Sequence, residues 1–162
     1  MKCLNCGTPM KSRKENYHYT ESGLPNIVLA DVEVRNCAKC GEREVVIPRL
    51  DELHRAIARE VIEQEAKLGA EQIRFLRKYL GWSQADLAAH MSVQGETVSR
   101  WETGNQDMGP VADRLLRLLV NNREPATSYP IDLFKHKFGK TAKATLEFKA
   151  KPTWRTTRRR AA

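Results

Sequence analysis

Apolar residues in the first 48 positions recur with the two-residue period of β-strands. Val32 and Val34 alternate with charged neighbours, which places the two valines on one face of a strand. The segments 26–29 and 44–47 are short and rich in β-branched residues, and glycine and proline punctuate the chain between them. We therefore predict a small β-rich module over residues 1–48.

After residue 48 the apolar period changes to that of a helix. One helical stripe carries the apolar residues Leu50, Leu53, Ile57, Val61 and Leu68. Charged residues occupy the rest of the helical wheel, and Gly69 ends this amphipathic pattern. We predict a helical connector over residues 49–69, whose stripe is able to pack on either neighbouring module.

Residues 70–124 keep the helical pattern and divide into four helices. The second helix is expected to begin after Ser83, because Asp86 stands three residues on and completes a capping box. A turn near Ser92 separates it from the third helix, which stops at Gly104. A tight turn between the middle two of four helices is typical of a helix-turn-helix domain. The predicted fold class is thus α+β, with a β-rich module followed by an all-α module.

The remaining segment, residues 125–162, is a basic tail with weak periodicity and many helix breakers. Some β structure is predicted around Thr145 to Phe148, and much of the rest is expected to lack regular structure. The tail holds ten Lys and Arg against two acidic residues, an excess equal to the net charge of +8 of the whole chain. We expect it to attract polyanions, DNA first, with strong salt dependence. A solvated terminus without a partner is the alternative.

Composition places the chain among folded proteins that do not span a membrane. Hydrophobic residues make up 41% of its 162 residues, and no apolar run approaches the ~18 residues that a membrane span needs. The N-terminal residues lack the apolar core of a secretory signal, so we expect a cytoplasmic protein. Thiols stay reduced in that compartment, which favours metal binding over disulfides for the cysteines.

Four cysteines form two C-x-x-C pairs, each followed by a glycine. Two residues between thiolates let a tight turn aim both sulfurs at one ion, so we expect a tetrahedral zinc site at Cys3, Cys6, Cys37 and Cys40. The gap between the pairs leaves room for a hairpin or a small sheet. Iron in a rubredoxin-like site, two disulfides and a redox dithiol are the alternatives.

The zinc ion is expected to be single and structural, and the chain is not expected to be an enzyme. Four sulfur ligands leave no open coordination position for a water molecule or a substrate. The four histidines are scattered and lie in no ligand spacing. A redox protein that uses C-x-x-C, or a metal nuclease, is the enzymatic alternative, and the missing His and carboxylate constellation argues against it.

Two sets of motifs carry a resemblance to known families. The segment IRFLRKYLGWSQADLAAHM, followed by VSRWETG, resembles the Xre (Cro/repressor-type) DNA-binding family over roughly 50 residues. With CxxCG repeated upstream, the chain resembles the MqsA/YgiT-type family of zinc-finger plus helix-turn-helix antitoxins, from Met1 to about Val120. Members of that family use the zinc domain to hold a toxin, often an mRNA-cutting ribonuclease. They use the helical domain to dimerise and to repress their own operon.

The resemblance implies a set of DNA-contacting residues in the second and third helices of the helical module. By position, this set is Gln84, Gln94, Glu96, Thr97, Ser99 and Arg100. Arg100 is the best candidate for reading a base, because its planar guanidinium matches O6 and N7 of guanine. A salt bridge within the domain, with a partner such as Glu102, is the alternative for Arg100, and Trp101 is expected to be a core residue.

Two residues depart from the family pattern at the start of the third helix. Where the family commonly has an amide, Glu96 carries a carboxylate, which phosphates repel and which reads only a donor such as cytosine N4. Gly95 costs about 1 kcal/mol inside a helix, so a helix that begins one residue late is an alternative. Both residues put the base readout, but not the fold, in question.

The resemblance thus implies a DNA-binding repressor that acts as the antitoxin of a type II toxin-antitoxin pair. Its expected partners are operator DNA, a toxin protein and a second copy of the chain. A stand-alone zinc-containing transcriptional regulator is the alternative. Leu115, Leu116, Leu118 and Leu119 are assigned equally to a dimer interface and to the core.

Overall fold

The computed structural model describes residues 1–123, 145–150 and 153–160, which fold into two compact units. The first, called the sheet unit, contains Met1–Thr20, Pro25–Leu53 and two C-terminal strands. The second, called the helical unit, contains Glu21–Leu24 and residues 54–123. None of the helices among the described residues is long and apolar enough to cross a bilayer.

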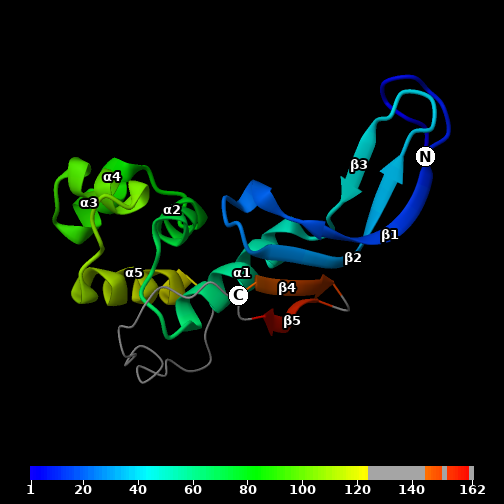
Figure 1. Cartoon of the computed structure of the whole chain (residues 1–162). Helices are drawn as coiled ribbons and strands as arrows, with labels where there is room; N and C mark the ends of the chain where they lie inside the picture. Colours follow the sequence, from blue (N-terminus) through cyan, green and yellow to red (C-terminus); the bar gives the residue numbers. More distant parts are fainter. Residues whose placement is uncertain (124–144, 151–152, 161–162) are drawn as a thin grey trace. The chain divides into compact units, whose positions relative to one another are not determined.

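The sheet unit is built around one long central strand. Its five strands are β1 (Lys11–His18), β2 (Ile27–Asn36), β3 (Arg43–Val46), β4 (Thr145–Ala150) and β5 (Trp154–Arg160). Along one edge of β2 lies β1, antiparallel to it, so the hairpin expected between the two cysteine pairs is present. Along the other edge lie β3, antiparallel, and β4, parallel, and β5 in turn pairs with β4 (Figure 1).

A β-bulge divides β2 into two halves. Ala30 and Asp31 together face the single residue Asn16 of β1, because Glu15 pairs with Val32 and Tyr17 with Leu29. Asp31 has a φ of 55°, and its N–H donates to Oδ1 of Asn16 at 3.3 Å. The outer edge of β2 changes its neighbour at this point, since residues 27–29 pair with β4 and residues 33–36 pair with β3.

The core of the sheet unit lies against one face of β2. Val32 and Val34 are buried, which confirms the two-residue period read from the sequence. The segment 26–29 and the alternating segment 31–36 belong to the same strand, because the bulge bends β2 without ending it. The other buried apolar residues of this unit are Cys3, Tyr19, Ile27, Leu29, Ala30, Cys37, Leu53, Phe148 and Trp154.

The C-terminal strands belong to this sheet. The β structure predicted around Thr145 to Phe148 is present as β4, whereas β5 had no prediction. Phe148 is fully buried in the sheet unit, although its partners on β2 lie more than 100 residues earlier in the chain. A tail that joins a distant strand leaves little local signal, because its hydrophobic face is completed by another part of the sequence. The predictions for residues 125–144 lie outside the described residues.

The helical unit contains four complete helices and most of a fifth. The helices are α1 (Leu50–Glu63), which begins in the sheet unit, α2 (Ala70–Tyr79), α3 (Gln84–Met91), α4 (Gly95–Thr103) and α5 (Pro110–Arg123). Buried residues come from every helix, including Ile57 and Val61, which the sequence placed on the α1 stripe, as well as Ile73, Leu76, Leu87, Val98, Leu116 and Val120.

The helix predicted to continue to Gly69 ends at Glu63, and a buried arginine explains why. Nη1 of Arg117 donates to the carbonyl oxygens of Ile62 and Gln64 at 2.8 and 2.7 Å, and Nη2 donates to that of Ala66 at 2.7 Å. These bonds satisfy carbonyls that a longer helix would use internally. The side chain comes from α5 and therefore could not be inferred from the α1 pattern.

The start of α3 follows the predicted capping box. The hydroxyl of Ser83 accepts from the N–H of Asp86 at 3.1 Å, and the Asp86 carboxylate accepts from the N–H of Ser83 at 2.8 Å. The Ser83 hydroxyl also donates to Oδ2 of Asp86 at 2.7 Å, and this bond first, with the bond from the Ser83 N–H second, holds the pKa of Asp86 below its usual value. The helix ends at Met91, and its C-cap Ser92, with a left-handed φ of 53°, starts the turn to α4.

Candidate metal centre and candidate DNA-binding surface

The two cysteine pairs adopt the same backbone turn. The N–H of Cys3 donates to the carbonyl of Thr8 at 2.9 Å, and the N–H of Gly7 donates to the carbonyl of Cys3 at 2.9 Å. The second pair repeats both bonds at 2.9 and 3.0 Å, with Cys37, Glu42 and Gly41 in the corresponding places. Gly7 and Gly41 have φ values of 70° and 75°, which a side chain would strain. The turns therefore require the glycine that follows each pair.

All four thiols converge on one point of the sheet unit. Their Sγ atoms lie within 4.8 Å of one another, with 3.6 Å between Cys3 and Cys40 and 3.4 Å between Cys6 and Cys37. A tetrahedral ion with Zn–S bonds of about 2.3 Å separates its sulfurs by about 3.8 Å. The cysteine cluster therefore matches the size of a four-sulfur site for one metal ion.

The surroundings shift the pKa values of Cys6 and Cys40 in opposite directions. Hydrogen bonds with Thr8, through its side chain first and its backbone second, and then with Cys37 lower the pKa of Cys6 to about 6. The backbone of Glu42 acts in the same direction on Cys40, but burial and hydrogen bonds with Cys3, Cys6 and Cys37 outweigh it and raise the pKa of Cys40 to about 12. Sequence reasoning missed Thr8, which follows the first C-x-x-C-G directly.

Histidine takes no part in this cluster. Among the described residues, one group of His, Cys, Asp or Glu side chains lies close enough together to share an ion, and it consists of the four cysteines. His90 instead stacks on Trp82 in the helical unit, with ring centroids 3.9 Å apart, and its Nδ1 lies 2.8 Å from the carbonyl oxygen of Asp86. Four sulfurs around an ion leave no further coordination position, which suits a structural role.

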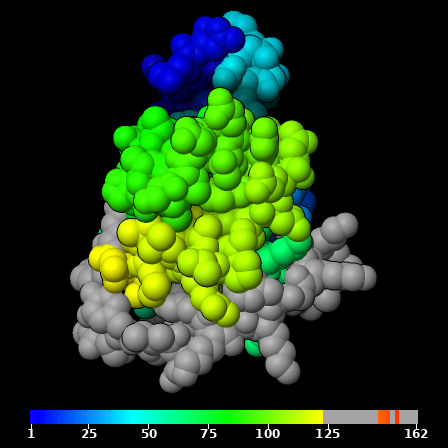
Figure 2. Space-filling model, turned by 90° about the vertical axis from the view of Figure 1, so that its left-hand side faces the viewer, coloured from blue at the N-terminus to red at the C-terminus, as the bar shows by residue number. Residues whose placement is uncertain are grey.

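The six residues proposed to contact DNA lie on α3, on α4 and at the turn that joins them. Gln84 begins α3, Gln94 is the N-cap of α4, and the others lie within α4. Gln84, Gln94, Glu96 and Arg100 are exposed, and Thr97 and Ser99 are half-buried. Figure 2 views the helical unit from the side on which Figure 1 places α3 and α4.

A buried carboxylate orders the residues behind this surface. Glu102 is 2% exposed, and its Oε1 accepts from Nε of Arg77 at 2.5 Å. Its Oε2 accepts from Nη2 of Arg77 at 3.0 Å and from Nε2 of Gln84 at 2.9 Å. Burial by itself raises the pKa of Glu102, but these bonds outweigh burial and leave the pKa below its usual value. Gln84 therefore has a structural partner that the sequence did not indicate.

Arg100 takes no part in that network. Glu102 pairs with Arg77 and Arg74, so the alternative of an Arg100–Glu102 salt bridge is wrong. Over the described ranges, the Arg100 side chain has neither a hydrogen bond nor an ion pair. Trp101, on the other side of α4, is 4% exposed, which confirms its place in the core. The guanidinium of Arg100 is therefore available to an external ligand.

The first turn of α4 starts at the glycine. Gln94 is the N-cap, with extended backbone, and Gly95 is the first helical residue, so the helix does not begin one residue late. The space that a side chain on Gly95 would enter is open, because no heavy atom beyond its chain neighbours and the nearby backbone of α4 lies within 4 Å of the Cβ position. Glu96 lies in the same first turn, where the positive end of the helix dipole favours a carboxylate.

The four-cysteine cluster and the helix-turn-helix arrangement of α3 and α4 define a protein that joins a candidate metal-binding sheet unit to a helical unit. The family described as the antitoxin component of a bacterial toxin-antitoxin system, MqsA, matches residues 1–126, and the chain belongs to this family. A search of curated proteins gives no match. The match ends before β4 and β5.

Proposed function

We propose that this protein is a sequence-specific DNA-binding repressor that serves as the antitoxin of a type II toxin-antitoxin pair. The exposed Arg100 carries the DNA-binding part of the proposal, since it lies on α4 beside Thr97 and Ser99 while the nearby Glu102 is sequestered by Arg77. A guanidinium held this way can donate two hydrogen bonds to guanine in the major groove. Gln94 and Glu96, at the start of α4, belong to the same proposed surface.

Operator binding is tested by fluorescence anisotropy with a duplex from the promoter of the chain's own operon, against a scrambled duplex of equal length. Arg100→Ala is expected to weaken specific binding by about 5- to 150-fold and to leave the scrambled duplex less affected, because a bidentate contact to guanine is worth about 1–3 kcal/mol. Lys78→Ala removes an exposed charge on α2 and is the matched control. Equal losses on both duplexes would assign Arg100 to the phosphates.

The cysteine cluster is proposed to hold one structural Zn²⁺. The support is the fit of the sulfur separations and the repeated turn that carries each pair. When bound, the ion joins the two turns, and Cys3, Cys6, Cys37 and Cys40 hold it. A sheet unit of this size has a small core, so the metal is expected to contribute much of its stability. Elemental analysis of protein isolated anaerobically distinguishes zinc from iron.

The proposed partner of the sheet unit is a toxin, bound in the cytoplasm. The antitoxin family to which the chain belongs suggests that this toxin is an mRNA-cleaving ribonuclease. Family membership supports a toxin partner, and the test is co-expression with the protein encoded by the adjacent gene. Co-purification in a fixed ratio, with loss of ribonuclease activity, is the expected result. Absence of such a neighbour leaves a stand-alone regulator.

A homodimer is proposed through α5. Val111 is 79% exposed, Leu118 is 37% exposed and Leu115 is half-buried between them, so the three form an apolar stripe at helical spacing. Leu116 is fully buried and belongs to the core. Two-fold symmetry is what an operator with two half-sites requires.

A further inference from the structure

The β4–β5 hairpin rests on a short stretch of β2. Three residue pairs join β2 to β4: Ile27 with Leu146, Val28 with Glu147 and Leu29 with Phe148. The N–H of Leu146 also donates to the carbonyl of Asn26 at 2.7 Å. Six pairs, by contrast, join β4 to β5. The hairpin is therefore held together more extensively than it is held to β2.

Two aromatic side chains anchor the hairpin in the sheet unit. Phe148, on β4, is 0% exposed, and Trp154, which opens β5, is 5% exposed. The indole N–H of Trp154 donates to the carbonyl of Pro48 at 2.8 Å. On the rim, Nζ of Lys149 lies 3.2 Å from Oδ2 of Asp31, and the carbonyl of Ala150 accepts from Arg49. The contact thus has a buried centre and a polar rim, as binding interfaces do.

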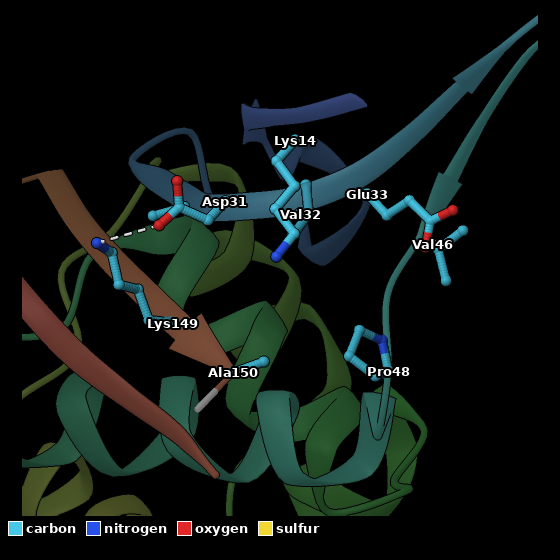
Figure 3. A pocket seen from close by; sticks show the side chains of 9 residues that line it. Lys14, Asp31, Val32, Glu33, Val46, Pro48, Lys149 and Ala150 are labelled. Carbon is cyan, nitrogen blue, oxygen red and sulfur yellow. Dashed lines mark ion pairs between the residues drawn. The ribbon is translucent and has the colours of Figure 1, made fainter. Parts of the chain in front are cut away.

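A cavity of about 270 Å³ continues this site along β2. It lies where the bulge separates the β4-paired half of β2 from the β3-paired half, and Ala30 and Val32 line it together with Val46, Pro48 and Ala150 (Figure 3). Lys14, Asp31, Glu33 and Lys149 supply its charged lining. The outer edge of β2 at residues 30–32 is paired with neither β3 nor β4.

The hairpin lies outside the residues that match the family. Those residues include β1, β2 and β3, and without the hairpin residues 26–29 form an edge of the sheet. An open edge offers unpaired N–H and C=O groups to any extended strand, and proteins cover such edges or use them to bind peptides. In this chain the β4–β5 hairpin occupies that edge, because β4 pairs with residues 27–29 of β2.

We propose that residues 26–29 of β2, with the adjoining cavity, form a strand-binding site on the sheet unit, and that the β4–β5 hairpin is its tethered and exchangeable occupant. The site accepts an extended segment that pairs in parallel with β2 and inserts an aromatic side chain at the Phe148 position. A polypeptide that pairs with this edge must first displace the hairpin, so the hairpin controls access to the edge. The proposal does not depend on DNA or toxin binding.

The test keeps the full chain and adds a protease cleavage site between residues 123 and 145. After cleavage of the folded protein, a fluorescent peptide of residues 144–162 is expected to replace the resident hairpin and bind saturably. The intact chain is expected to bind it at least tenfold more weakly, since its site is filled by a segment at high effective concentration. A peptide with Phe148→Ala is expected to bind at least tenfold more weakly than the native peptide. A peptide with Thr153→Ala, at an exposed position, is the control.

All these substitutions lie in the peptide, so the folding of the protein is unaffected. Equal uptake by the cleaved and intact chains, or no loss with Phe148→Ala, overturns the proposal. Hydrogen exchange on the intact chain gives an independent measurement. Amides of β4 and β5 are expected to exchange through local opening, faster than those shared by β1 and β2. If the amides of β4 and β5 exchange only through global unfolding, as those of β1 and β2 do, the proposal is also overturned.

Discussion

Arg117 and Asp113 lie one turn apart on α5 and form a buried ion pair, with 2.6 Å between Nε and Oδ1 and each residue 1% exposed. The second oxygen of Asp113 accepts from the N–H of Leu68 at 2.8 Å. The pair therefore connects α5 to the segment that follows α1. All three nitrogens of the Arg117 guanidinium donate, Nε to this carboxylate and the two Nη atoms to three backbone carbonyls.

Removal of Arg117 is predicted to destabilise the helical unit strongly. Arg117→Met leaves the Asp113 carboxylate and three carbonyls without their donor, and such a change costs about 3–5 kcal/mol. Urea denaturation followed by circular dichroism measures the loss. Arg59→Ala breaks an exposed i,i+4 pair with Glu63 on α1 and is expected to cost at most about 1 kcal/mol. Equal losses of unfolding free energy for the two variants would contradict a stabilising role of the buried Arg117 bonds.

The buried Glu102 is predicted to make the stability of the helical unit fall in acid. Its folded pKa lies below the ordinary value of 4.5, so the folded state binds the proton less readily than the unfolded state. Its contribution is complete above pH 4.5 and is lost as the pH falls through the folded pKa. Glu102→Gln is expected to flatten the dependence of unfolding free energy on pH in this range. An unchanged slope would show that other carboxylates determine it.

Metal removal is predicted to unfold the sheet unit. Binding of structural zinc supplies about 10–16 kcal/mol in small zinc domains, so a chelator or Cys3→Ser removes the main cross-link between the two cysteine turns. Two-dimensional NMR is expected to lose the dispersed signals of β1–β3 and to keep those of α2–α5. Met10→Ser, near the first turn but outside the cluster, is the control. Dispersed β1–β3 signals in metal-free protein would refute a structural ion.

The apolar stripe on α5 is predicted to hold the dimer. Val111→Glu places a charge in the proposed interface and is expected to convert dimer to monomer in analytical ultracentrifugation, at concentrations where the wild type is dimeric. Leu4→Glu, at a residue of the sheet unit that is 93% exposed, serves as the control. A Val111→Glu variant that remains dimeric would place the interface elsewhere.

Gly95 is predicted to be replaceable by alanine. No atom crowds its Cβ position, and alanine is favoured over glycine in a helix by up to about 1 kcal/mol. Gly95→Ala is thus expected to raise the midpoint of thermal unfolding slightly. Gly104→Ala, at a φ of 76°, is expected to lower it, because an added side chain strains the left-handed end of α4.

Local signals predicted the parts of the fold that local residues determine. The spacing of the cysteines predicted their cluster, the alternation around Val32 predicted a strand, and Ser83 with Asp86 predicted the start of α3. The role of Arg117, the strand β5 and the pairing of β4 with β2 were missed for the opposite reason. Each is placed by atoms far away in the sequence, such as the carbonyl of Ile62 or the edge of β2. The pattern of apolar residues in a short stretch of sequence therefore does not reveal which distant residues it will contact.

The bonds from Arg117 to the end of α1 also set an order of folding. Arg117 and Ile62 are 55 positions apart, and the chain between them contains α2, α3 and α4 entirely. The bonds at the end of α1 cannot form until that whole loop has closed. The chain therefore loses the entropy of loop closure before it gains these contacts. A ribosome must therefore release the start of α5 before the last turn of α1 is secured.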